Sequence, residues 1–506
     1  MIFDSITLSL LFIALATFVS AKLLWELVFS PLRAFPGPFL ARFTDGWRSY
    51  LTTLGNVDRK HLAWHHKWGS AVRVGPNAIS LNDPDLIKTL YGTKNPWRKS
   101  DMYRPNDVVV NGARIQNIFN TQDKKFHAKY ARPIGGFWIL SKVLELEPLF
   151  DETLRLLVSK LNEEFMQKGA VCMMDNWLAY FAWDAAANVS FGRHYGFIEE
   201  GEDVGGIISE STAGLKYFSA ISQIPWLDNW LDKNPWYRIG PRPLVNGFLY
   251  TVRILSEYQQ QVASGAVKRK EQDLFIDSYN GLKEKYDFVD DQQVINWLML
   301  NVLAGGDSTA GAMRPIFYHL AKNSDKYEKL VRELDGAGLS FPAQWKDCSK
   351  LPYLDACIRE AFRVNPAVGL MLEREVPSDG FTIPDGRFIP AGTKVGLNPA
   401  VVTRDSGVFG EDVEKYVPER WLQMEGESDV DFATRLRRMQ EATDLMFGAG
   451  SRVCMGKHLA RLEIYKLVAT LYSTFDVKLK DPGHEWTYCN AWFMYQSDMP
   501  MVLTAR

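Results

Sequence analysis

Residues Phe447 to Gly456 read FGAGSRVCMG, and this glycine-rich stretch around one cysteine decides how the rest of the chain is interpreted. Gly448 and Gly450 permit backbone conformations that a side chain would block. Apolar residues at helical spacing follow the stretch, so Cys454 is predicted to lie just before the first turn of a helix. The free amides and the dipole at such a helix end favour a thiolate over a thiol.

The role of Cys454 has two interpretations. A lone cysteine is more often a small buried hydrophobic residue than a metal ligand. The spacing F-x-x-G-x-R-x-C-x-G favours a ligand, because chance rarely places these residue types together in a chain of this length. A thiolate held among N–H donors is a good axial ligand for haem iron, and Arg452 is close enough in sequence to pair with a haem propionate.

This stretch resembles the haem-binding signature of the cytochrome P450 family. The resemblance implies a haem b cofactor with Cys454 as its axial thiolate ligand. It also implies that Phe447, Gly448, Arg452 and Gly456 shape the haem site, with Gly456 allowing close approach of a flat group.

Composition allows one large globular protein and gives no sign of a nucleic-acid partner. The chain has 506 residues, of which 46% are hydrophobic, with 58 Lys and Arg against 60 Asp and Glu. This balance lacks the basic excess that nucleic-acid binding requires. The cysteine count of 5 is odd, with no C-x-x-C pair or zinc spacing, which favours a reducing compartment over a disulfide framework.

Residues 1–30 are predicted to anchor the chain in a membrane. Ile6 to Ala21 contains no charged residue, and the apolar character continues to Phe29, which provides the roughly 20 residues that a spanning helix needs. A cleaved signal peptide is the alternative, but no basic residue precedes Ile6. Basic residues follow the apolar stretch, so its C-terminal side is predicted to be cytosolic.

Residues 31–42 are predicted to form a proline-rich hinge, because its prolines each fix φ and cannot continue a helix. A plain loop is the alternative. Such hinges are typical of membrane-anchored members of the family. The resemblance therefore implies one catalytic domain over residues 43–506, behind the anchor and the hinge.

A long helix is predicted from about Asp291 to Lys322, where apolar residues recur at helical spacing. Gly305 and Gly306 are unexpected within it, since glycine in a helix costs about 1 kcal/mol relative to alanine. We expect these glycines to leave room for a flat cofactor and a small ligand. A kinked helix with a solvated acid is the alternative.

Asp307, Ser308 and Thr309 follow these glycines and place an acid beside two hydroxyl groups. Cleavage of the O–O bond of dioxygen consumes two protons, and an acid–hydroxyl pair is suited to relay them. The family usually has threonine where this chain has Ser308, so the hydroxyl is kept and the methyl group is lost. The resemblance implies that Asp307 and Ser308 deliver protons, with Thr309 beside them.

Glu360 and Arg363 are spaced to face each other on a helix. Taken alone, such a pair is usually a surface ion pair of small energetic value. Arg420 follows within Pro418 to Trp421, and the combination resembles the buried Glu–Arg–Arg network of the family. The resemblance implies that these three residues have a structural role, which is to hold the segment behind Cys454.

Three further residues resemble haem-propionate contacts. His127 occupies a position where the family has Trp or His, and Arg374 matches an arginine just before a strand. Ala131 stands where the family usually has arginine, but Arg132 is adjacent. An ordinary surface arginine is the alternative for Arg132. The resemblance implies that His127, Arg132 and Arg374 bind the propionates.

The remaining pattern predicts a mainly α fold with a small β portion. Strands are predicted near 70–82, 380–395 and the C-terminus, where apolar residues alternate around turns. The resemblance implies the cytochrome P450 fold, a single large haem-binding domain behind an N-terminal transmembrane helix. It also implies that the irregular segment 104–122 covers the substrate pocket, with 367–371 and 493–495 along its wall.

Residues 35–42 and 314–318 are most similar to fungal secondary-metabolism members of the family, such as pisatin demethylase. The resemblance implies a monooxygenase of the endoplasmic reticulum membrane that oxidises an apolar small molecule with O2, its catalytic domain facing the cytosol. Electrons would come from NADPH-cytochrome P450 reductase, since no flavin or nicotinamide motif is apparent in the chain.

Two other functions are compatible with the sequence. A haem-thiolate isomerase or reductase would need no external oxygen, although Asp307 and Ser308 argue against it. A haem-based sensor would bind the cofactor without turnover. The sequence does not distinguish among terpenoid, polyketide and aromatic substrates.

Overall fold

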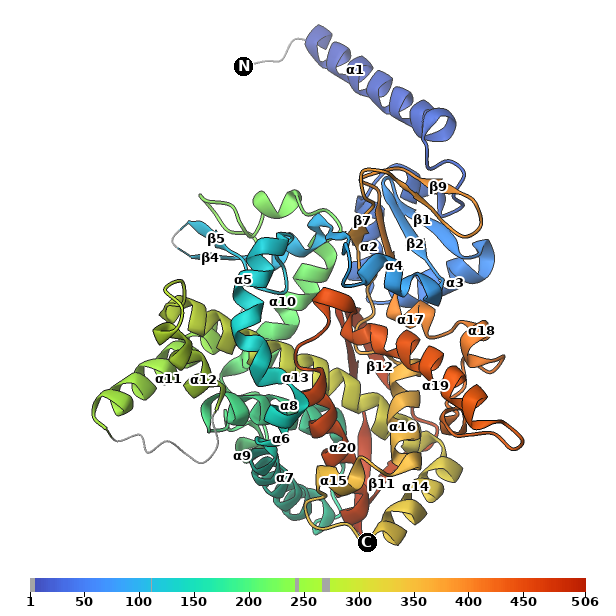
Figure 1. The fold of residues 1–506 in the computed structure, drawn as a ribbon. Helices are drawn as coiled ribbons and strands as arrows, with labels where there is room; N and C mark the ends of the chain where they lie inside the picture. Colours follow the sequence, from blue (N-terminus) through green and yellow to red (C-terminus); the bar gives the residue numbers. More distant parts are fainter. Residues whose placement is uncertain (1–4, 111, 242–244, 266–273) are drawn as a thin grey trace.

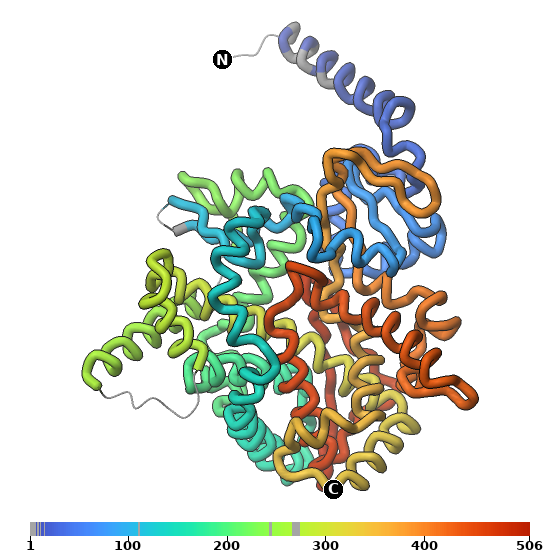
Figure 2. Tube along the Cα trace, viewed as in Figure 1, coloured from blue at the N-terminus to red at the C-terminus, as the bar shows by residue number. Residues whose placement is uncertain are grey.

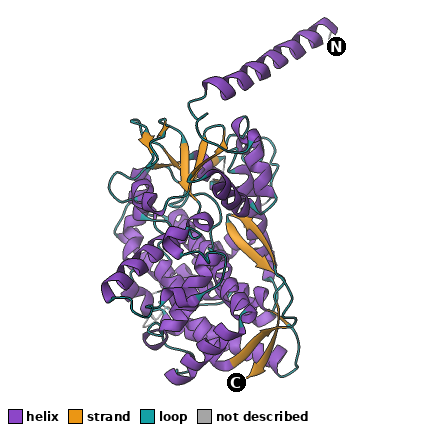
Figure 3. Ribbon diagram, turned by 90° about the vertical axis from the view of Figure 1, so that its right-hand side faces the viewer, coloured by secondary structure: helices purple, strands orange, loops and turns teal. Residues whose placement is uncertain are grey.

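The computed structural model describes residues 5–110, 112–241, 245–265 and 274–506. It shows a helical body from which α1 (Ser5–Leu24) projects (Figure 1). Short strands lie at the end of the body beside α1 and along one side, with helices filling the rest (Figure 3). This arrangement confirms the predicted mainly α fold with a small β portion.

Helices alternate with short strands along the described residues. After α1, the helices are α2 Gly46–Thr53, α3 Val57–Trp68, α4 Ile87–Tyr91, α5 Lys124–Gly135, α6 Leu140–Leu144, α7 Glu147–Leu161, α8 Met174–Phe191, α9 Phe197–Glu200, α10 Ile207–Ile221, α11 Val245–Ala263, α12 Phe275–Gly281, α13 Asp291–Lys322, α14 Ser324–Ala337, α15 Trp345–Cys348, α16 Pro352–Val364, α17 Pro399–Val402, α18 Ser406–Phe409, α19 Asp429–Thr443 and α20 Lys457–Thr474. The strands are β1 Ala71–Gly75, β2 Ala78–Leu81, β3 Arg98–Lys99, β4 Val108–Val110, β5 Ala113–Ile115, β6 Cys172–Met173, β7 Arg374–Glu375, β8 Phe381–Thr382, β9 Phe388–Ile389, β10 Lys394–Leu397, β11 Phe475–Leu479, β12 Thr487–Ala491, β13 Phe493–Ser497 and β14 Pro500–Ala505.

One helical segment among the described residues is long and apolar enough to cross a membrane. It runs from Phe12 to Phe29, has a mean hydropathy of 1.8, and is not buried in the body. The segment includes the end of α1 and a π-helical turn, Trp25–Phe29. At this turn Glu26 forms an ion pair of 2.6 Å with the buried Arg73 of β1. The foot of the apolar helix is therefore attached to the sheet.

The predicted hinge at 31–42 packs against the body. Leu32 and Phe35 are buried in a hydrophobic cluster with the strands. Gly37 passes so close to β1 that a Cβ there would lie 2.1 Å from the carbonyl oxygen of Arg73. The prolines give the segment its stiffness, but the apolar residues between them fix it against the sheet.

The largest sheet has five strands in the order β1-β2-β10-β7-β3. β1 and β2 form the hairpin predicted near 70–82. β10 joins β2 in parallel, so segments near residues 80 and 395 lie side by side (Figure 2). β7 and β3 complete the sheet, with Arg374 directly opposite Lys99. The sequence pattern missed β3 and β7 because strands of 2 residues carry no alternation.

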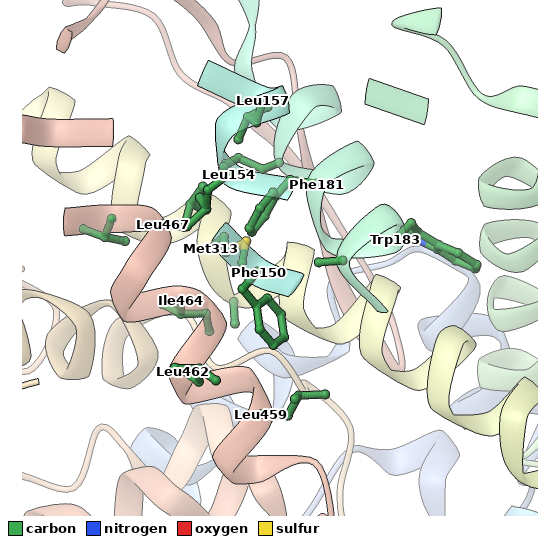
Figure 4. Close-up of a cluster of buried hydrophobic side chains, with 14 of the residues drawn as sticks. Phe150, Leu154, Leu157, Phe181, Trp183, Met313, Leu459, Leu462, Ile464 and Leu467 are labelled. Carbon is green, nitrogen blue, oxygen red and sulfur yellow. The ribbon is translucent and has the colours of Figure 1, made fainter. Parts of the chain in front are cut away.

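α13 is central to the helical core, and its bounds match the prediction. It packs against α8, α16 and α20, the last being the helix that follows Cys454. Apolar side chains from α7, α8, α13 and α20 meet in one buried cluster (Figure 4), which includes Phe150, Leu154, Phe181, Met313, Leu459, Leu462 and Leu467. Burial of each such side chain contributes about 1.5–3 kcal/mol, so the cluster holds the start of α20 in place.

Two truncations test whether the hinge belongs to the body. Removal of residues 1–24 keeps Glu26 and Phe35, so the remaining chain is expected to retain its stability. Removal of residues 1–42 takes Phe35 out of the core and leaves Arg73 buried without its partner, which is expected to lower the free energy of unfolding by about 3 kcal/mol or more. Urea unfolding followed by circular dichroism measures the difference. Equal midpoints for the two truncations would show that the hinge is only a linker.

Candidate active site

The backbone of the cysteine loop, residues 447–456, requires its glycines. Gly448 and Gly450 have φ angles of 71° and 60°, in the left-handed region that side chains disfavour, which confirms the prediction. A Cβ at Gly450 would also lie 1.8 Å from the carbonyl oxygen of Tyr91 in α4. The loop is therefore packed against the end of α4, and only glycine fits at this contact.

Cys454 lies just before α20, as predicted. Its N–H donates to the carbonyl oxygen of Phe447 at 2.7 Å, and its sulfur accepts from the N–H groups of Gly456 and Lys457. Many protein atoms surround the residue, yet Cys454 keeps an exposed surface. Cys454 is therefore accessible to a ligand.

The helix end alone does not make Cys454 a thiolate, contrary to the expectation. Burial raises the pKa of the Cys454 thiol and outweighs the amides of Gly456 and Lys457, which lower it. A bound metal cation deprotonates a coordinating thiol outright. The N–H donors then hold the sulfur in position and moderate its charge.

A cavity of about 400 Å³ opens beside the cysteine loop, next to β3 and α5. Its charged and imidazole side chains are Arg98, Lys99, Lys124, His127, Arg132 and Arg452, and no described carboxylate lines it. Burial and then neighbouring cations lower the pKa of His127 to about 4 and that of Arg452 to about 10. The cavity therefore has the positive potential that suits an anionic group.

Most residues predicted to contact propionates border this basic region. His127, Arg132 and Arg452 line the cavity, and Ala131 lines it as well, so the displaced arginine still reaches it. Arg374 is buried in β7 with its guanidinium 4.8 Å from the ring centre of Tyr91. Burial is the largest cause that lowers the pKa of Arg452, and the positive charge of Arg374 is the second largest. The structure thus brings His127, Arg132 and Arg452 together around one space, with Arg374 close enough to act on Arg452.

The two glycines of α13 do not face open space, contrary to the prediction. A Cβ on Gly306 would lie 2.5 Å from the indole ring of Trp183, and a Cβ on Gly305 would lie 3.3 Å from the side chain of Ala186. Both neighbours belong to α8. The glycines therefore allow α8 and α13 to pack closely, which explains why glycine occurs at these two positions in a helix.

The open face of α13 is formed instead by Ala304 and Ser308, one turn apart. Ala304 is exposed and Ser308 is half-buried, whereas Thr309 is buried. The Ser308 hydroxyl donates to the carbonyl oxygen of Ala304 at 2.5 Å. Because residues i and i+4 share a helix face, the Ser308 hydroxyl stands on the exposed face of α13.

Asp307 points into a buried polar cluster instead of this open face. Its carboxylate accepts a hydrogen bond of 2.5 Å from the hydroxyl of Ser211 in α10, with Tyr495 of β13 and Trp183 of α8 beside it. Burial raises the pKa of Asp307 to about 6, although Ser211 and Tyr495 oppose the shift. A carboxyl group with this pKa exchanges protons near neutral pH, as acid–base chemistry requires.

Glu360 of α16 lies at the centre of a buried ionic network. Glu360 and Arg363 have fully buried side chains and form a bidentate pair with both N–O distances at 2.9 Å. Arg420 donates to the same carboxylate at 2.9 Å. Burial raises the pKa of Glu360, but the two arginines outweigh it and hold the pKa below its usual value. The geometry is that of an internal brace and not of a surface ion pair.

Sequence reasoning missed Lys99, Ser211 and Trp183, which reach the site from β3, α10 and α8. Ser211 is 96 residues from the Asp307 that it contacts, so no local pattern connects them. The only signal for Lys99 in the sequence was its charge, because its burial is visible only in the structure.

The comparison with protein families agrees with this geometry. The model of the family described as cytochrome P450 matches residues 63–500, a range that contains every residue of the site described above. The chain is a cytochrome P450. The family match therefore agrees with the resemblance that the cysteine loop of this P450 shows in the sequence.

Curated proteins that are similar to this P450 include fungal monooxygenases. Cytochrome P450 monooxygenase cfoH of Aspergillus candidus is 34% identical over 97% of this chain and 92% of its own length. A cytochrome P450 monooxygenase of Aspergillus flavus is 37% identical over 89% of this chain and 88% of its own length. Cytochrome P450 monooxygenase asR2 of Sarocladium schorii is 34% identical over 99% of this chain and 98% of its own length. The P450 is therefore an enzyme of the monooxygenase class.

The residues present fit the haem-thiolate group that the family implies. Cys454 keeps an exposed surface, and the N–H groups of Gly456 and Lys457 at the start of α20 donate to its sulfur. The basic cavity is suited to a group that carries two carboxylates, because cations line it and no described acid neutralises them. The cysteine loop supplies Cys454 and Arg452, and β3 and α5 supply the other cations of the cavity.

Replacement of Gly450 tests the contact between the cysteine loop and α4. Gly450→Ala places an alanine in a left-handed backbone conformation and forces Tyr91 away. Overpacking is expected to lower the free energy of unfolding by about 1–3 kcal/mol, in addition to the loss from backbone strain. Gly386→Ala is the matched control, because Gly386 has a φ of 88° but nothing within 4 Å of its Cβ position. That control is expected to cost about 1 kcal/mol. Thermal unfolding of both variants measures these costs. An equal loss of stability in the two variants would contradict the contact between Gly450 and Tyr91.

Asp307→Asn tests the buried acid through the pH dependence of stability. The pKa of Asp307 is raised to about 6 in the folded protein, against about 3.9 in an unfolded chain. The native state therefore binds more protons over this window, and wild-type stability falls as pH rises through it. The stability of the variant relative to wild type is expected to rise by about 1 kcal/mol between pH 5 and pH 7.5.

The measurement is urea unfolding of both proteins at the two pH values. Asp287→Asn, which changes an exposed carboxylate, is the control and is expected to show no such trend. A relative stability of Asp307→Asn that is constant with pH would mean that Asp307 is ionised throughout the window.

Proposed function

We propose that this P450 binds haem b through Cys454 and oxidises an apolar small molecule of fungal secondary metabolism, using O2 and electrons from NADPH-cytochrome P450 reductase. The observation that carries the proposal is Cys454, whose sulfur accepts from two backbone amides and which keeps an exposed surface inside the cysteine loop. Haem bound there supplies the activation of dioxygen that side chains alone lack.

The haem-binding residues are assigned from the loop and the basic cavity. Phe447 and Gly448 shape the turn, and Gly456 leaves the space near the sulfur free of a side chain, since a Cβ there would lie 3.9 Å from the sulfur. The propionates are assigned to four basic residues around the cavity and β7, namely His127, Arg132, Arg374 and Arg452. Glu360, Arg363 and Arg420 position the loop and touch no reacting group.

Proton delivery is assigned to the middle of α13. Ser308 presents a hydroxyl at the open face, so it is the last group before the reacting oxygen. Asp307, with a pKa raised to about 6 by burial, is the acid that supplies the proton from the polar cluster behind. Thr309 is buried beside them and supports the helix turn that carries both.

An apolar substrate is supported by a cluster of aromatic rings from separate segments. Phe119 and Trp492 lie 5.5 Å apart, and Trp492 also contacts Tyr103 and Phe218, each at 5.7 Å. These rings come from the segment 101–122, from α10 and from the turn between β12 and β13. Edge-to-face rings make a rigid apolar surface, which is consistent with the segment 104–122 covering a hydrophobic substrate.

The location follows from the apolar helix at the N-terminal end of the described residues. We assign residues 1–30 as a single-pass anchor in the endoplasmic reticulum membrane, with the catalytic domain of 43–506 in the cytosol. The segment Phe12–Phe29 has the required length and hydropathy, and basic residues follow it. A cytosolic catalytic domain at that membrane meets the reductase, which supplies the electrons.

The absorption spectrum of the reduced protein with carbon monoxide tests the centre of this proposal. The wild-type protein is expected to show the red-shifted Soret band of thiolate-ligated haem, and Cys454→Ala is expected to lose it completely. Cys489→Ala, which changes a half-buried cysteine outside the loop, is the control and should keep the band. A wild-type band at the position of haem with a neutral ligand would contradict the assignment of Cys454.

Turnover with purified reductase and NADPH then tests the reaction class. Oxidised product from an apolar substrate library is expected only when both are present. Product formed without them would favour an isomerase, and haem binding without any product would favour a sensor.

A further inference from the structure

One indole ring borders the space beside the Cys454 sulfur. A Cβ at Gly456 would lie 3.9 Å from the sulfur and 3.5 Å from the ring of Trp138. Apart from the chain neighbours of Gly456, no other described residue lies within 4 Å of that position. Trp138 therefore closes this side of the sulfur, and it does so from the short helical turn Gly136–Trp138 that follows α5.

The position of this ring is fixed by stacking and by one hydrogen bond. Trp138 is 9% exposed and stacks on Phe275 of α12, with the ring centres 4.4 Å apart and the planes at 22°. Its indole N–H donates to the hydroxyl oxygen of Tyr279 in the same helix at 3.1 Å. Because the N–H is the only polar group of an indole, this hydrogen bond sets which way the ring faces.

Tyr279 connects the indole to α13. Tyr279 is fully buried, and its hydroxyl oxygen lies 3.3 Å from Oδ1 and 3.1 Å from Nδ2 of Asn301. An indole N–H can only donate, so the Tyr279 oxygen accepts from it and its own proton can be donated to Oδ1. Asn301 lies two helical turns before Ser308, which places both residues on the same face of α13. The chain of hydrogen bonds thus runs from the sulfur side of the site to the face that carries Ser308.

A second indole in the same cluster is not held in this way. Trp297 of α13 is 1% exposed and packs on Tyr279 with the ring centres 5.4 Å apart. Its N–H has no hydrogen-bond partner among the described residues. Of the two indoles beside the Tyr279 hydroxyl, the one that is hydrogen-bonded to it is the one that borders the sulfur.

We propose that Trp138 is a positioning residue for Cys454, which closes the space beside the sulfur and is held there by a bridge through Tyr279 to Asn301. The proposal rests on the function proposed above, since it concerns the sulfur assigned to haem. A water molecule in that space would donate a hydrogen bond to the sulfur and reduce the charge that the ligand gives to a bound metal. The indole excludes such a water, and the bridge fixes the indole relative to α13.

Trp138→Ala opens this space and tests the proposal in the haem-loaded full chain. Its reduced carbon monoxide complex is expected to convert from the red-shifted to the unshifted Soret band about 10-fold faster than wild type, which is the cost of losing an outer partner of a metal ligand. Its reduction potential is expected to rise, because a hydrogen bond from water to the sulfur lowers the charge donated to the iron. Both measurements are made without substrate or reductase, so neither depends on turnover.

Tyr279→Phe tests the bridge, because it removes the hydroxyl and keeps the ring. Conversion of the Soret band is expected to be about 3-fold faster than in wild type, as the loss of one neutral hydrogen bond predicts. The double variant of Trp138→Phe and Tyr279→Phe is expected to convert no faster than Trp138→Phe alone, since both changes remove the same hydrogen bond. Additive effects in the double variant would overturn the bridge.

Trp297→Phe is the matched control. It removes the same atoms from the indole that packs on Tyr279 without a hydrogen bond to it. The control is expected to lower the urea midpoint of unfolding but to keep the wild-type rate of conversion. A conversion rate that follows the loss of stability in every variant, Trp297→Phe included, would show a purely structural role and overturn the proposal.

Two further outcomes separate this proposal from the proposed function. A red-shifted band in wild type, together with equal conversion rates in wild type and Trp138→Ala, would overturn the role of Trp138 and leave the proposed function standing. A wild-type chain that gives no red-shifted band would overturn both.

Discussion

The buried carboxylate of Glu360 is the interaction on which the rest of the site depends. An unpaired charge at this depth would cost several kcal/mol, so every donor around it has to stay in place. Its hydrogen bonds come from Arg363, Val417, Arg420 and Trp421. Arg363 in turn donates to carbonyl oxygens of Thr403, Val413 and Lys415. The irregular segment 403–421 is thereby fixed on α16, and the chain continues from it through α19 into the cysteine loop.

Tyr91 joins this helical part to the sheet. Its carbonyl oxygen lies where a side chain at Gly450 would be, and its hydroxyl donates to Leu372 and accepts from the N–H of Leu397, both at 2.8 Å. The guanidinium of Arg374 lies over its ring. One residue therefore touches the cysteine loop, two segments of the sheet region and a basic residue of the site. The cavity beside the loop lies at the junction that Tyr91 organises.

The features that sequence reasoning predicted are those encoded locally. The position of Cys454 before α20 and the bounds of α13 both follow from periodicity and spacing within a few turns. The orientation of Gly306 was not predictable, because the shape it fits is the ring of Trp183 on another helix. The raised pKa of the Cys454 thiol was not predictable for a related reason, since burial comes from the whole fold and a helix end is local. Lys99 escaped notice because its meaning depends on the strand placed opposite.

The contact between Ser211 and Asp307 has a consequence for timing. Ser211 belongs to α10 and Asp307 to α13, so the acid is tuned by a neighbouring helix as well as by its own. Loss of that donor raises the proton affinity of the carboxylate, because the hydrogen bond from Ser211 holds it down. A displacement of α10, which also carries Phe218 of the aromatic cluster, would therefore slow proton release at the same moment that it loosens the cover. The proton affinity of Asp307 and the packing of the aromatic cluster are therefore coupled through the position of one helix.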